Sequence, residues 1–456
     1  MLFNLAQAAK WLNLPPLADT NVDAVKITGV SQDSRLVQRG DLFVAIKGQR
    51  HDAHDSLAEV AAKGAVAALV ERPNKKINLP QLIVPNTVLA LGRLAAQYRA
   101  QFSIPVIALT GSVGKTTVKE MLAQILQQSQ SVLYSSGNFN TDIGLPLTLL
   151  RLTPEHDIAV IEMGARNVGE IAYLAGLAKP SIALITNIGI NHIEVFGSVE
   201  NIAKGKGELF EALPEAGTAI IWMDDPNLAP WNKKLTTQNR IRVRLAAAPD
   251  ANLWAEDCQV LPDRCQLTLV YKNQQKVAIQ LPIPGEHNIT NALLAAAGAI
   301  AAGLTLPQIQ QGLNTFKPFV AGRLQLKKGR LGATIIDDTY NASPPSMLAA
   351  FKVLAQQKGV PIVVMGDMFE LADTAPQHHH DMGREAQTLG IAHFIGFGPF
   401  SAKAAQGFGE KGIHCETLEA VLAAIEPLLL QYKEQAVILV KGSRGMKMER
   451  VVEALC

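Results

Sequence analysis

Apolar positions in the middle of the chain fall into short runs that alternate with longer helical stretches. Between residues 86 and 316 the runs VIALT, AVIEMG and SIALITNIG are rich in β-branched residues, and each leads into glycine or asparagine. Such runs are typical of strands that are buried on both faces between helices. The pattern therefore predicts an α/β fold with a mostly parallel central sheet.

The two flanking regions show the same alternation. Residues 1–85 contain the strand-like runs AVKITGV, DLFVAI and AVAALV beside alanine-rich helical segments. After Lys317 the runs ATIIDDT, PIVVMGD, HFIGFG and AVILVK alternate with helices, as in Rossmann-like nucleotide-binding domains. A more polar stretch, 258–283, predicts antiparallel strands ahead of an alanine-rich helix from Asn288 onward. We predict three domains, at 1–85, 86–316 and 317–456.

Composition narrows the class of protein. The 456 residues carry 42 lysines and arginines against 40 acids, and this balance argues against nucleic-acid binding. The longest uncharged apolar run spans about 14 residues, below the roughly 20 of a transmembrane helix. The four cysteines lack metal-ligand spacing and disulfide density, and the amino-terminal segment lacks the pattern of a signal peptide. We expect a cytoplasmic monomer without a membrane span.

The strongest chemical motif is TGSVGKTT at residues 110–117. A strand precedes it and a helix to about Gln128 follows, so backbone N–H groups would gather around phosphates. Lys115 would reach the β- and γ-phosphates of ATP, and Thr116 would hold Mg²⁺. Leu109 stands where the usual motif has its first glycine, unlike most motor ATPases and GTPases. The predicted loop comprises Gly111, Ser112, Val113, Gly114, Lys115, Thr116 and Thr117.

Two side chains follow predicted strands of the same sheet. Glu162 ends IAVIE, where a carboxylate can bind Mg²⁺; a role as an acid at a helix start is equally consistent with the sequence. His192 follows ALITNIGIN, and a structural histidine competes with a metal ligand there. Lys204 and Lys206 lie in NIAKGKGELF, which by itself predicts a solvated helix face.

Further polar groups are candidates for nucleotide contacts. Asn288 and Asn291 share one side of a helix start, which suits an adenine edge or helix capping. Arg323 can neutralise a γ-phosphate, and an aspartate at a strand end can hold a ribose. The run 378–380, three histidines, predicts a solvated surface. The third region adds Asp337, Asp338, Tyr340 and Asn341, and a candidate anion site at Lys441, Ser443 and Arg444.

These segments together resemble the Mur ligases. The matching motifs are TGSVGKTT, GNFNTDIGLPLTLL, IEMGARNVGEI, TNIGINHIEVFGS, AKGKGELF, GEHNITNALLAAA, AGRLQ, DDTYNASPPSM and VKGSRGMKME, in family order over nearly the whole chain. The resemblance implies a domain for the UDP end of the substrate, a central ATPase and a carboxyl-terminal Rossmann-like domain. The last two motifs point to the member that adds D-alanyl-D-alanine to UDP-N-acetylmuramoyl-tripeptide through an acyl phosphate.

The resemblance also implies roles for individual residues. Lys115, Thr116, Glu162 and His192 would bind phosphates and Mg²⁺, and Lys206 would carry a carbamate that organises a second Mg²⁺. Asn288 and Asn291 would contact adenine, Arg323 phosphate and Asp338 ribose. The residues that would face the UDP precursor or the reacting centre are Ser31, Asp33, Ser34, Arg35, Lys47, Gly48, His51, Asp52, Asn138, Asn140 and Thr141, with Tyr340, Asn341, Lys441, Ser443 and Arg444 in the third region.

Two rival functions are consistent with parts of this pattern. A folylpolyglutamate synthase-like ligase would share the ATP site, although the SQDSR segment argues against it. A non-catalytic ATP-gated switch would bind nucleotide without amine-dependent phosphate release.

If the ATP contacts come from two domains, as Lys115 and Arg323 imply, the site is complete only when those domains meet.

Overall fold

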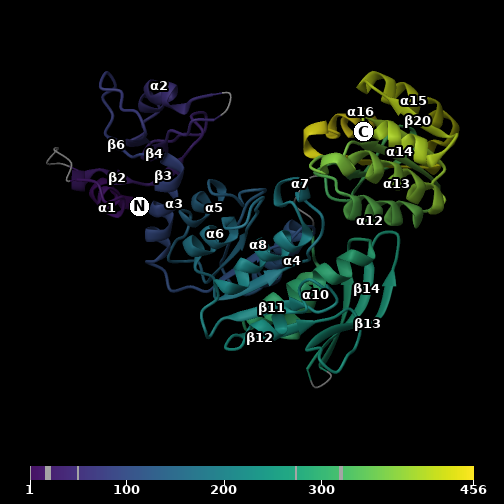
Figure 1. Cartoon of the computed structure of the whole chain (residues 1–456), viewed down its shortest axis with the longest axis horizontal. Coiled ribbons are helices and arrows are strands. Elements are labelled where there is room, and N and C mark those ends of the chain that lie inside the picture. The colour runs from purple at the N-terminus through teal and green to yellow at the C-terminus, as the bar shows by residue number, and fades with distance from the viewer. Residues whose placement is uncertain (1, 16–21, 49–50, 273–274, 318–321) are drawn as a thin grey trace.

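Three α/β units follow one another along the chain, each with its own sheet (Figure 1). The computed structural model describes residues 2–15, 22–48, 51–272, 275–317 and 322–456. The second unit lies between the first and the third, which stand at opposite ends of the molecule (Figure 1). The predicted three-domain α/β class is confirmed. The predicted boundary between residues 316 and 317 lies just ahead of residues 318–321, which are outside the described ranges.

The first unit is built on a parallel sheet in the order β3-β4-β5-β6. A short pair, β1 with β2, and helix α1 lie beside it, and helix α3 leads into the second unit (Figure 1). The core of this unit is continuous with that of the second through α3, whose Leu91 and Leu94 are fully buried. The bounds are β1 Phe3–Asn4, α1 Leu5–Trp11, β2 Lys26–Ile27, β3 Gly29–Ser31, β4 Asp41–Val44, α2 Leu57–Ala62, β5 Ala67–Val70, β6 Gln81–Ile83 and α3 Thr87–Arg99.

The second unit has nine strands in the order β15-β14-β13-β12-β11-β10-β7-β9-β8. The strands from β8 to β13 are parallel, and β13, β14 and β15 are antiparallel, as the polar stretch 258–283 predicts. The bounds are β7 Val106–Thr110, β8 Val132–Tyr134, β9 Ile158–Glu162, β10 Ile182–Ile185, β11 Thr218–Trp222, β12 Asn239–Val243, β13 Leu253–Val260, β14 Cys265–Tyr271 and β15 Gln275–Leu281.

Helices cover both faces of this sheet. Residues of α6 and α8 share one buried cluster with residues of the first unit, and residues of α4, α10 and α11 belong to a second cluster. The connection that leaves β7 runs toward one edge of the sheet, and the connection that leaves β10 runs toward the other edge. The carboxyl ends of these two neighbouring strands therefore form a topological switch point, which is where ligands bind in open α/β sheets. The bounds are α4 Lys115–Leu126, α5 Gly144–Leu149, α6 Glu170–Ala178, α7 Ile193–Phe196, α8 Val199–Glu211, α9 Trp231–Lys234, α10 Glu286–Ala301 and α11 Leu306–Asn314.

The third unit has six strands in the order β16-β17-β21-β18-β19-β20, and only β16 is antiparallel to its neighbour. Buried clusters on both faces of this sheet complete a Rossmann-like layering. The bounds are β16 Gln325–Lys328, β17 Thr334–Asp338, α12 Pro344–Ala355, β18 Val360–Gly366, α13 Ala375–Thr388, β19 His393–Phe397, α14 Ser401–Phe408, β20 Gly412–Cys415, α15 Leu418–Tyr432, β21 Ala436–Lys441 and α16 Glu449–Leu455.

One predicted surface is wrong. His379, in the middle of the three consecutive histidines, is fully buried on α13. Its Nδ1 donates to the carbonyl of Ala375 at 2.6 Å, and its Nε2 accepts the N–H of Met368 at 2.9 Å. Its two neighbours are half-buried, because adjacent positions on a helix point in different directions. The polar sequence around the run hid one inward-facing ring.

In the described part of the chain, no helix has the length and apolar character to cross a membrane.

Candidate functional site

The phosphate loop joins β7 to α4 with two glycines that other residues could not replace. Gly114 has φ +80°, a left-handed conformation, and a Cβ there would lie 2.6 Å from Oδ1 of Asn291. A Cβ on Gly111 would lie 1.9 Å from Oγ1 of Thr186. The loop is therefore packed directly against the ends of β10 and α10.

Side chains after β10 hold the loop in shape. The backbone N–H of Val113 donates to Oδ1 of Asn187 at 3.0 Å, and Oγ1 of Thr186 donates to the carbonyl of Val113 at 2.6 Å. The hydroxyl of Ser112 accepts the N–H of Gly189 at 2.8 Å. Sequence reasoning assigned no role to Thr186 or Asn187. The signal available was their position directly after a buried strand of the same sheet.

Lys115 lies over this loop. Its ammonium donates to the carbonyls of Gly111 at 2.7 Å and Ser112 at 3.2 Å. Burial lowers the pKa of Lys115, which the negative charge of Glu162 partly opposes. No ion pair of Lys115 with a carboxylate occurs among the described residues, so a phosphate would be a stronger partner than the loop carbonyls.

The residues predicted to hold Mg²⁺ meet beside the loop. Oγ1 of Thr116 donates to Oε1 of Glu162 at 3.4 Å, and Nδ2 of Asn140 donates to the same oxygen at 2.8 Å. Glu162 ends β9 and is 2% exposed, and its Oε2 has no hydrogen-bond partner within the described ranges. A hydroxyl and a buried carboxylate with a free oxygen fit Mg²⁺, which keeps other positions for water and phosphate oxygens. The alternative of an acid at a helix start is wrong, because Glu162 ends a strand.

A second buried lysine supports this carboxylate. Lys119 is fully buried on α4 and donates to the carbonyl of Ser135 at 2.7 Å. Its ammonium lies 3.0 Å from Oε1 of Glu120 and 3.9 Å from Oε2 of Glu162. Sequence reasoning missed Lys119, because a lysine four residues after Lys115 looks like any polar position of a helix.

Lys206 is buried although its sequence predicts a solvated helix face. The side chain is 1% exposed on α8, whereas Lys204 is exposed. Burial, and then the nearby charge of Lys115, lower the pKa of Lys206 to about 7. A lysine with this pKa is substantially neutral at neutral pH, and a neutral amine is the form that reacts with carbon dioxide. The solvated-face prediction is wrong for Lys206.

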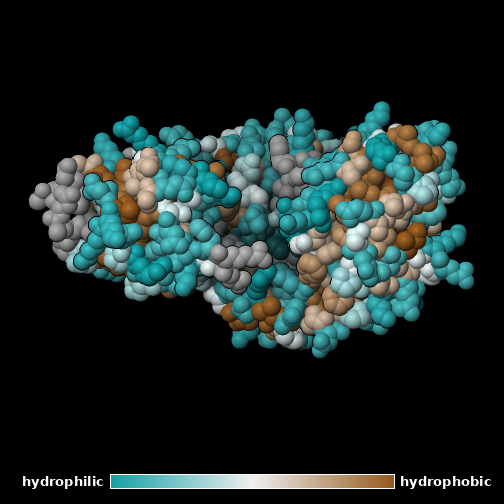
Figure 2. Space-filling view, turned by 90° about the horizontal axis from the view of Figure 1, so that it is seen from above, coloured by the Kyte–Doolittle hydropathy of each residue, from teal (hydrophilic) through white to brown (hydrophobic). Residues whose placement is uncertain are grey.

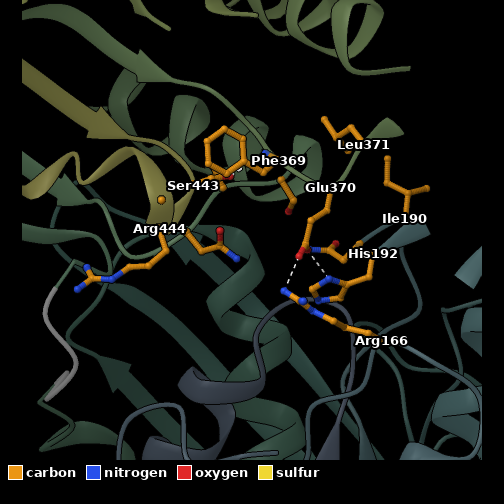
Figure 3. Close-up of a pocket in the computed structure, with 13 residues that line it drawn as sticks. Arg166, Ile190, His192, Phe369, Glu370, Leu371, Ser443 and Arg444 are labelled. Atoms are coloured by element: carbon orange, nitrogen blue, oxygen red, sulfur yellow. Dashed lines mark hydrogen bonds and ion pairs between the residues drawn. The ribbon is translucent and has the colours of Figure 1, made fainter. Parts of the chain in front are cut away.

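His192 contacts the third unit. Its backbone has φ +61°, and its Nδ1 contacts Oε2 of Glu370 (Figure 3). Arg166 reaches the other oxygen of Glu370 at 2.6 Å. His192 lowers the pKa of Glu370, although burial opposes this effect. Among the described residues, His192 makes no hydrogen bond or ion pair with Thr116 or Glu162.

Arg323 of the third unit reaches the loop of the second. Its Nη2 donates to Oγ1 of Thr116 at 3.0 Å, and its guanidinium stacks over the ring of Tyr340 at 4.3 Å. Its Nε is buried without a hydrogen-bond partner in the described chain. The structure thus brings together two groups, separated by about 200 residues in sequence, that the sequence predicts to share one phosphate site.

The predicted ribose and anion contacts are already paired with protein groups. Asp338 lies 2.6 Å from Nζ of Lys441, and that ammonium also donates to the carbonyl of Asn341 at 2.7 Å. Burial raises the pKa of Asp338, and Lys441 opposes this effect. The hydroxyl of Ser443 accepts the N–H of Phe369, while Arg444 is exposed. The predicted anion site is therefore divided between a buried ion pair and an exposed arginine whose Nη1 lies 3.4 Å from Oε1 of Glu449.

The two asparagines of α10 form one buried network. Nδ2 of Asn291 donates to Oδ1 of Asn288 at 3.0 Å, and Nδ2 of Asn288 donates to the carbonyl of Pro284 at 2.7 Å. The capping alternative is wrong, because α10 begins at Glu286 and neither amide accepts a backbone N–H there. Asn291 nevertheless lies against the phosphate loop at Gly114.

The predicted UDP-precursor contacts lie in two turns of the first unit. Arg35 holds Asp33 at 2.6 Å and keeps the pKa of Asp33 at about 2. The backbone and side chain of His54 keep the pKa of Asp52 at about 2, and Arg72 contacts the same carboxylate at 2.5 Å. Asp52 is thus already held by its neighbours. Ser31 ends β3 and Ser34 lies in the turn after it, whereas Lys47, Gly48 and His51 lie on either side of residues 49–50, which are outside the described ranges.

The loop of the predicted reacting centre is largely solvent-accessible. Asn138 and Thr141 are exposed, and Asn140 is half-buried against Glu162. A cavity of about 270 Å³ opens between the second and third units (Figure 3). Hydrophilic residues border much of the central hollow in Figure 2. The cavity is lined by Arg166, His192, Asn341, Glu370, Ser443 and Arg444, among others.

The fold and this site define a protein that holds nucleotide phosphates beside a buried carboxylate and a lysine of lowered pKa. Three family models match the chain: the Mur ligase family catalytic domain at residues 26–99, the Mur ligase middle domain at 109–299 and the Mur ligase glutamate ligase domain at 322–444. The chain belongs to the Mur ligase family.

Individual relatives span nearly the whole chain. It is 44% identical over 443 residues, 96% of this chain and 94% of the relative, to UDP-N-acetylmuramoyl-tripeptide–D-alanyl-D-alanine ligase of Escherichia coli (strain K12). A crystal structure of MurF from Acinetobacter baumannii superposes with a TM-score of 0.90 at 36% identity, covering 99% of this chain and 98% of the other. MurF of Thermotoga maritima in complex with ADP superposes with a TM-score of 0.82 at 29% identity, covering 94% and 97%.

Proposed function

We propose that this chain is the ATP-dependent ligase that joins D-alanyl-D-alanine to UDP-N-acetylmuramoyl-tripeptide. The observation that carries the proposal is the 44% identity to the Escherichia coli ligase of that name over nearly the full length of both chains. The geometry supports it, because the phosphate loop, Glu162 and Lys206 lie in the unit between the two others (Figure 1).

The reaction needs two chemical steps. A carboxylate oxygen of the tripeptide attacks the γ-phosphorus of ATP, which gives an acyl phosphate and ADP. The amine of the dipeptide then attacks the acyl carbon, loses a proton, and expels inorganic phosphate with the former carboxylate oxygen. Both steps require charge neutralisation around the transferring phosphoryl group, which positioned cations supply.

We assign the cations and the metal site as follows. Lys115 binds the β- and γ-phosphates, and Arg323 of the third unit binds the transferring group, consistent with its contact to Thr116. Thr116, Glu162 and His192 would hold Mg²⁺, which when bound would offset the charge of phosphate oxygens. Asn140 positions Glu162 through its 2.8 Å hydrogen bond.

Lys206 is proposed to carry a carbamate. A lysine whose pKa is about 7 is partly neutral at neutral pH, so its nitrogen has a lone pair that can react with carbon dioxide. Carbamylation would replace a buried cation by an anion. The anion would lie near the charge of Lys115 and provide a further oxygen ligand for a second Mg²⁺. Burial without a carboxylate partner supports this assignment, because the ring of Phe196, whose centroid lies 5.8 Å from the ammonium, offsets the cost of a buried charge only in part.

The remaining nucleotide and substrate assignments need a change of partners. For Asn288 and Asn291 to bind adenine, and Asp338 to bind ribose, the present hydrogen bonds to Pro284 and Lys441 must be shared or exchanged. Both pairs lie within one unit, so we expect this exchange to come from side-chain rotation when the nucleotide binds. We propose that the turns of the first unit bind the UDP precursor, while the loop 138–141 and the predicted third-unit contacts at the cavity, Asn341, Ser443 and Arg444, face the reacting groups.

We further place the reaction in the cytoplasm, on a monomer, in peptidoglycan precursor synthesis that supports cell shape and division. The net charge of +2, from nearly equal numbers of basic and acidic residues, argues against a nucleic-acid partner.

The test is release of inorganic phosphate by the purified chain with ATP, Mg²⁺ and UDP-N-acetylmuramoyl-tripeptide. The proposal expects release that depends on D-alanyl-D-alanine, and little release when a folate acceptor replaces the UDP precursor. Nucleotide binding without dipeptide-dependent phosphate release would favour the ATP-gated switch instead. A Mycobacterium tuberculosis folylpolyglutamate synthase shares 17% identity with a TM-score of 0.63, which reflects the fold alone.

A further inference from the structure

Glu370 links the second and third units at the cavity between them. Oε2 contacts Nδ1 of His192, and Oε1 lies 2.6 Å from Nη2 of Arg166 (Figure 3). Glu370 follows β18 of the third unit, whereas both partners belong to loops of the second. A single carboxylate therefore spans the interface with both oxygens engaged.

The contact between Glu370 and His192 also affects which ring nitrogen of His192 can bind a metal. A neutral imidazole that ligates a metal offers the lone pair of one ring nitrogen, and the other nitrogen carries the hydrogen. Such histidines usually donate this N–H to a carboxylate, which fixes the tautomer and the ring orientation. In His192 the Nδ1 side faces Glu370, so Nε2 is the nitrogen left for a metal.

We propose that Glu370 is a positioning residue that orients His192 as a metal ligand from across the domain interface. This inference rests on the proposed function, in which His192 binds Mg²⁺. Its consequence is that the metal site of the second unit is fully assembled only while the third unit is docked. Metal binding and domain docking then strengthen each other, because each favours the same arrangement of His192.

The segment that carries Glu370 is held rigidly. The N–H of Met368 donates to Nε2 of the buried His379 at 2.9 Å, and the N–H of Phe369 donates to Oγ of Ser443 at 2.8 Å. Glu370 itself has φ +64°, an uncommon conformation for a residue with a side chain. Two consecutive anchored amides ahead of a left-handed residue fix where its carboxylate points. Such support is what a carboxylate needs in order to hold a histidine in one orientation.

Arg166 serves as an internal control for the role of Glu370. It also forms an ion pair with Glu370, but its side chain is 64% exposed, and its backbone N–H is separately held by Glu170 at 2.8 Å. If Glu370 only attaches the two units, removing Arg166 or Glu370 should have similar effects. If Glu370 orients His192, only the loss of Glu370 should weaken metal binding strongly.

The experiment measures Mn²⁺ binding to the full chain with a nonhydrolysable ATP analogue by electron paramagnetic resonance. Mn²⁺ is the probe because it accepts the oxygen and nitrogen ligands of a Mg²⁺ site. The variants are Glu370→Gln and Arg166→Gln, with Asp373→Asn as a matched control that removes an exposed carboxylate three residues further on. We expect Glu370→Gln to weaken Mn²⁺ binding roughly 10- to 100-fold, and the other two variants to change it less than about threefold.

A double-mutant cycle makes the test specific. If Glu370 acts through His192, adding Glu370→Gln to His192→Gln should cause no further loss of Mn²⁺ affinity. Additive losses would overturn the proposal, as would unchanged Mn²⁺ affinity in Glu370→Gln or an equal loss in Arg166→Gln. A raised KM for the dipeptide with unchanged metal affinity would instead assign Glu370 to substrate binding. Dipeptide-dependent phosphate release by the unaltered chain is measured separately, so failure of the proposed function is distinguishable.

Discussion

The second and third units both place charged side chains at the carboxyl ends of parallel strands, but they satisfy these charges differently. In the third unit Asp338 pairs with Lys441 at 2.6 Å, and Oδ1 of Asp367 accepts both the N–H and the hydroxyl of Ser401 at 2.7 Å. In the second unit Oε2 of Glu162 has no hydrogen-bond partner in the described chain.

Lys206 extends this difference. It is buried, and no ion pair of its ammonium with a carboxylate is found among the described residues. Because burying an unpaired charge is unfavourable, such groups persist where a ligand or a modification completes them. The second unit therefore leaves Glu162 and Lys206 available to a ligand. In the third unit, Asp338 and Asp367 are paired with groups of the same unit, so they keep these contacts if the domain moves.

The largest expected effect comes from Lys115→Ala. We expect turnover to fall by at least roughly 1,000-fold, because the variant lacks the cation nearest the predicted phosphates. Binding of the UDP precursor, measured by calorimetry, should remain within a few-fold of the original. Near-normal phosphate release by this variant would remove Lys115 from the site.

The next effect concerns Lys206. Lys206→Ala should lose most activity, on the order of 100-fold, and a short added carboxylic acid such as acetate should restore part of it by replacing the carbamate. Lys204→Ala, on the exposed side of the same helix, is the matched control and should keep full activity. Full activity of Lys206→Ala without the added acid would contradict carbamylation.

Replacing a buried charged residue should affect the stability of the chain differently in the two units. Asp338→Asn leaves Lys441 buried without its anion, and we expect a loss of about 3 kcal/mol in the free energy of unfolding. Lys206→Met removes a buried amine that lacks a carboxylate partner, so it should be neutral or stabilising. Urea denaturation of both variants measures the contrast. Equal destabilisation would show that the charges of the two units are satisfied alike.

The smallest effect is a pH dependence. The pKa of Lys206 is about 7 in the folded chain against an ordinary 10.5. Between these values the unfolded chain binds more protons, so the contribution of Lys206 to stability improves as pH rises, by at most about 1.4 kcal/mol per pH unit. Without carbon dioxide, any stability advantage of Lys206→Met should therefore shrink between pH 7 and 9. A constant advantage would mean that Lys206 keeps an ordinary pKa.

Much of the fold is readable from the sequence because local patterns determine it. The runs VIALT, IAVIE and ATIIDDT each become buried parallel strands, since β-branched residues suit a sheet that is covered on both faces. The phosphate loop follows from two glycines between a strand and a helix. The strand end at Glu162 follows from the same pattern, so its place beside Thr116 could be predicted.

Other parts of the site depend on contacts between distant segments. Lys206 and Lys204 are two residues apart in one polar motif, and only the packing of α8 decides that Lys206 is buried. The pairing of Asp338 with Lys441 joins two strands about 100 residues apart in sequence. The contact of Glu370 with His192 needs two domains in place, and no local pattern encodes it.

The most direct test of carboxylate activation follows an oxygen atom. UDP-N-acetylmuramoyl-tripeptide labelled with ¹⁸O in its terminal carboxylate is incubated with the chain, ATP, Mg²⁺ and D-alanyl-D-alanine, and the released phosphate is analysed by mass spectrometry. The account predicts one ¹⁸O atom in each phosphate formed from a fully labelled carboxylate. Phosphate that carries only solvent or ATP oxygen would show hydrolysis without an acyl phosphate, and would contradict the proposed ligase chemistry.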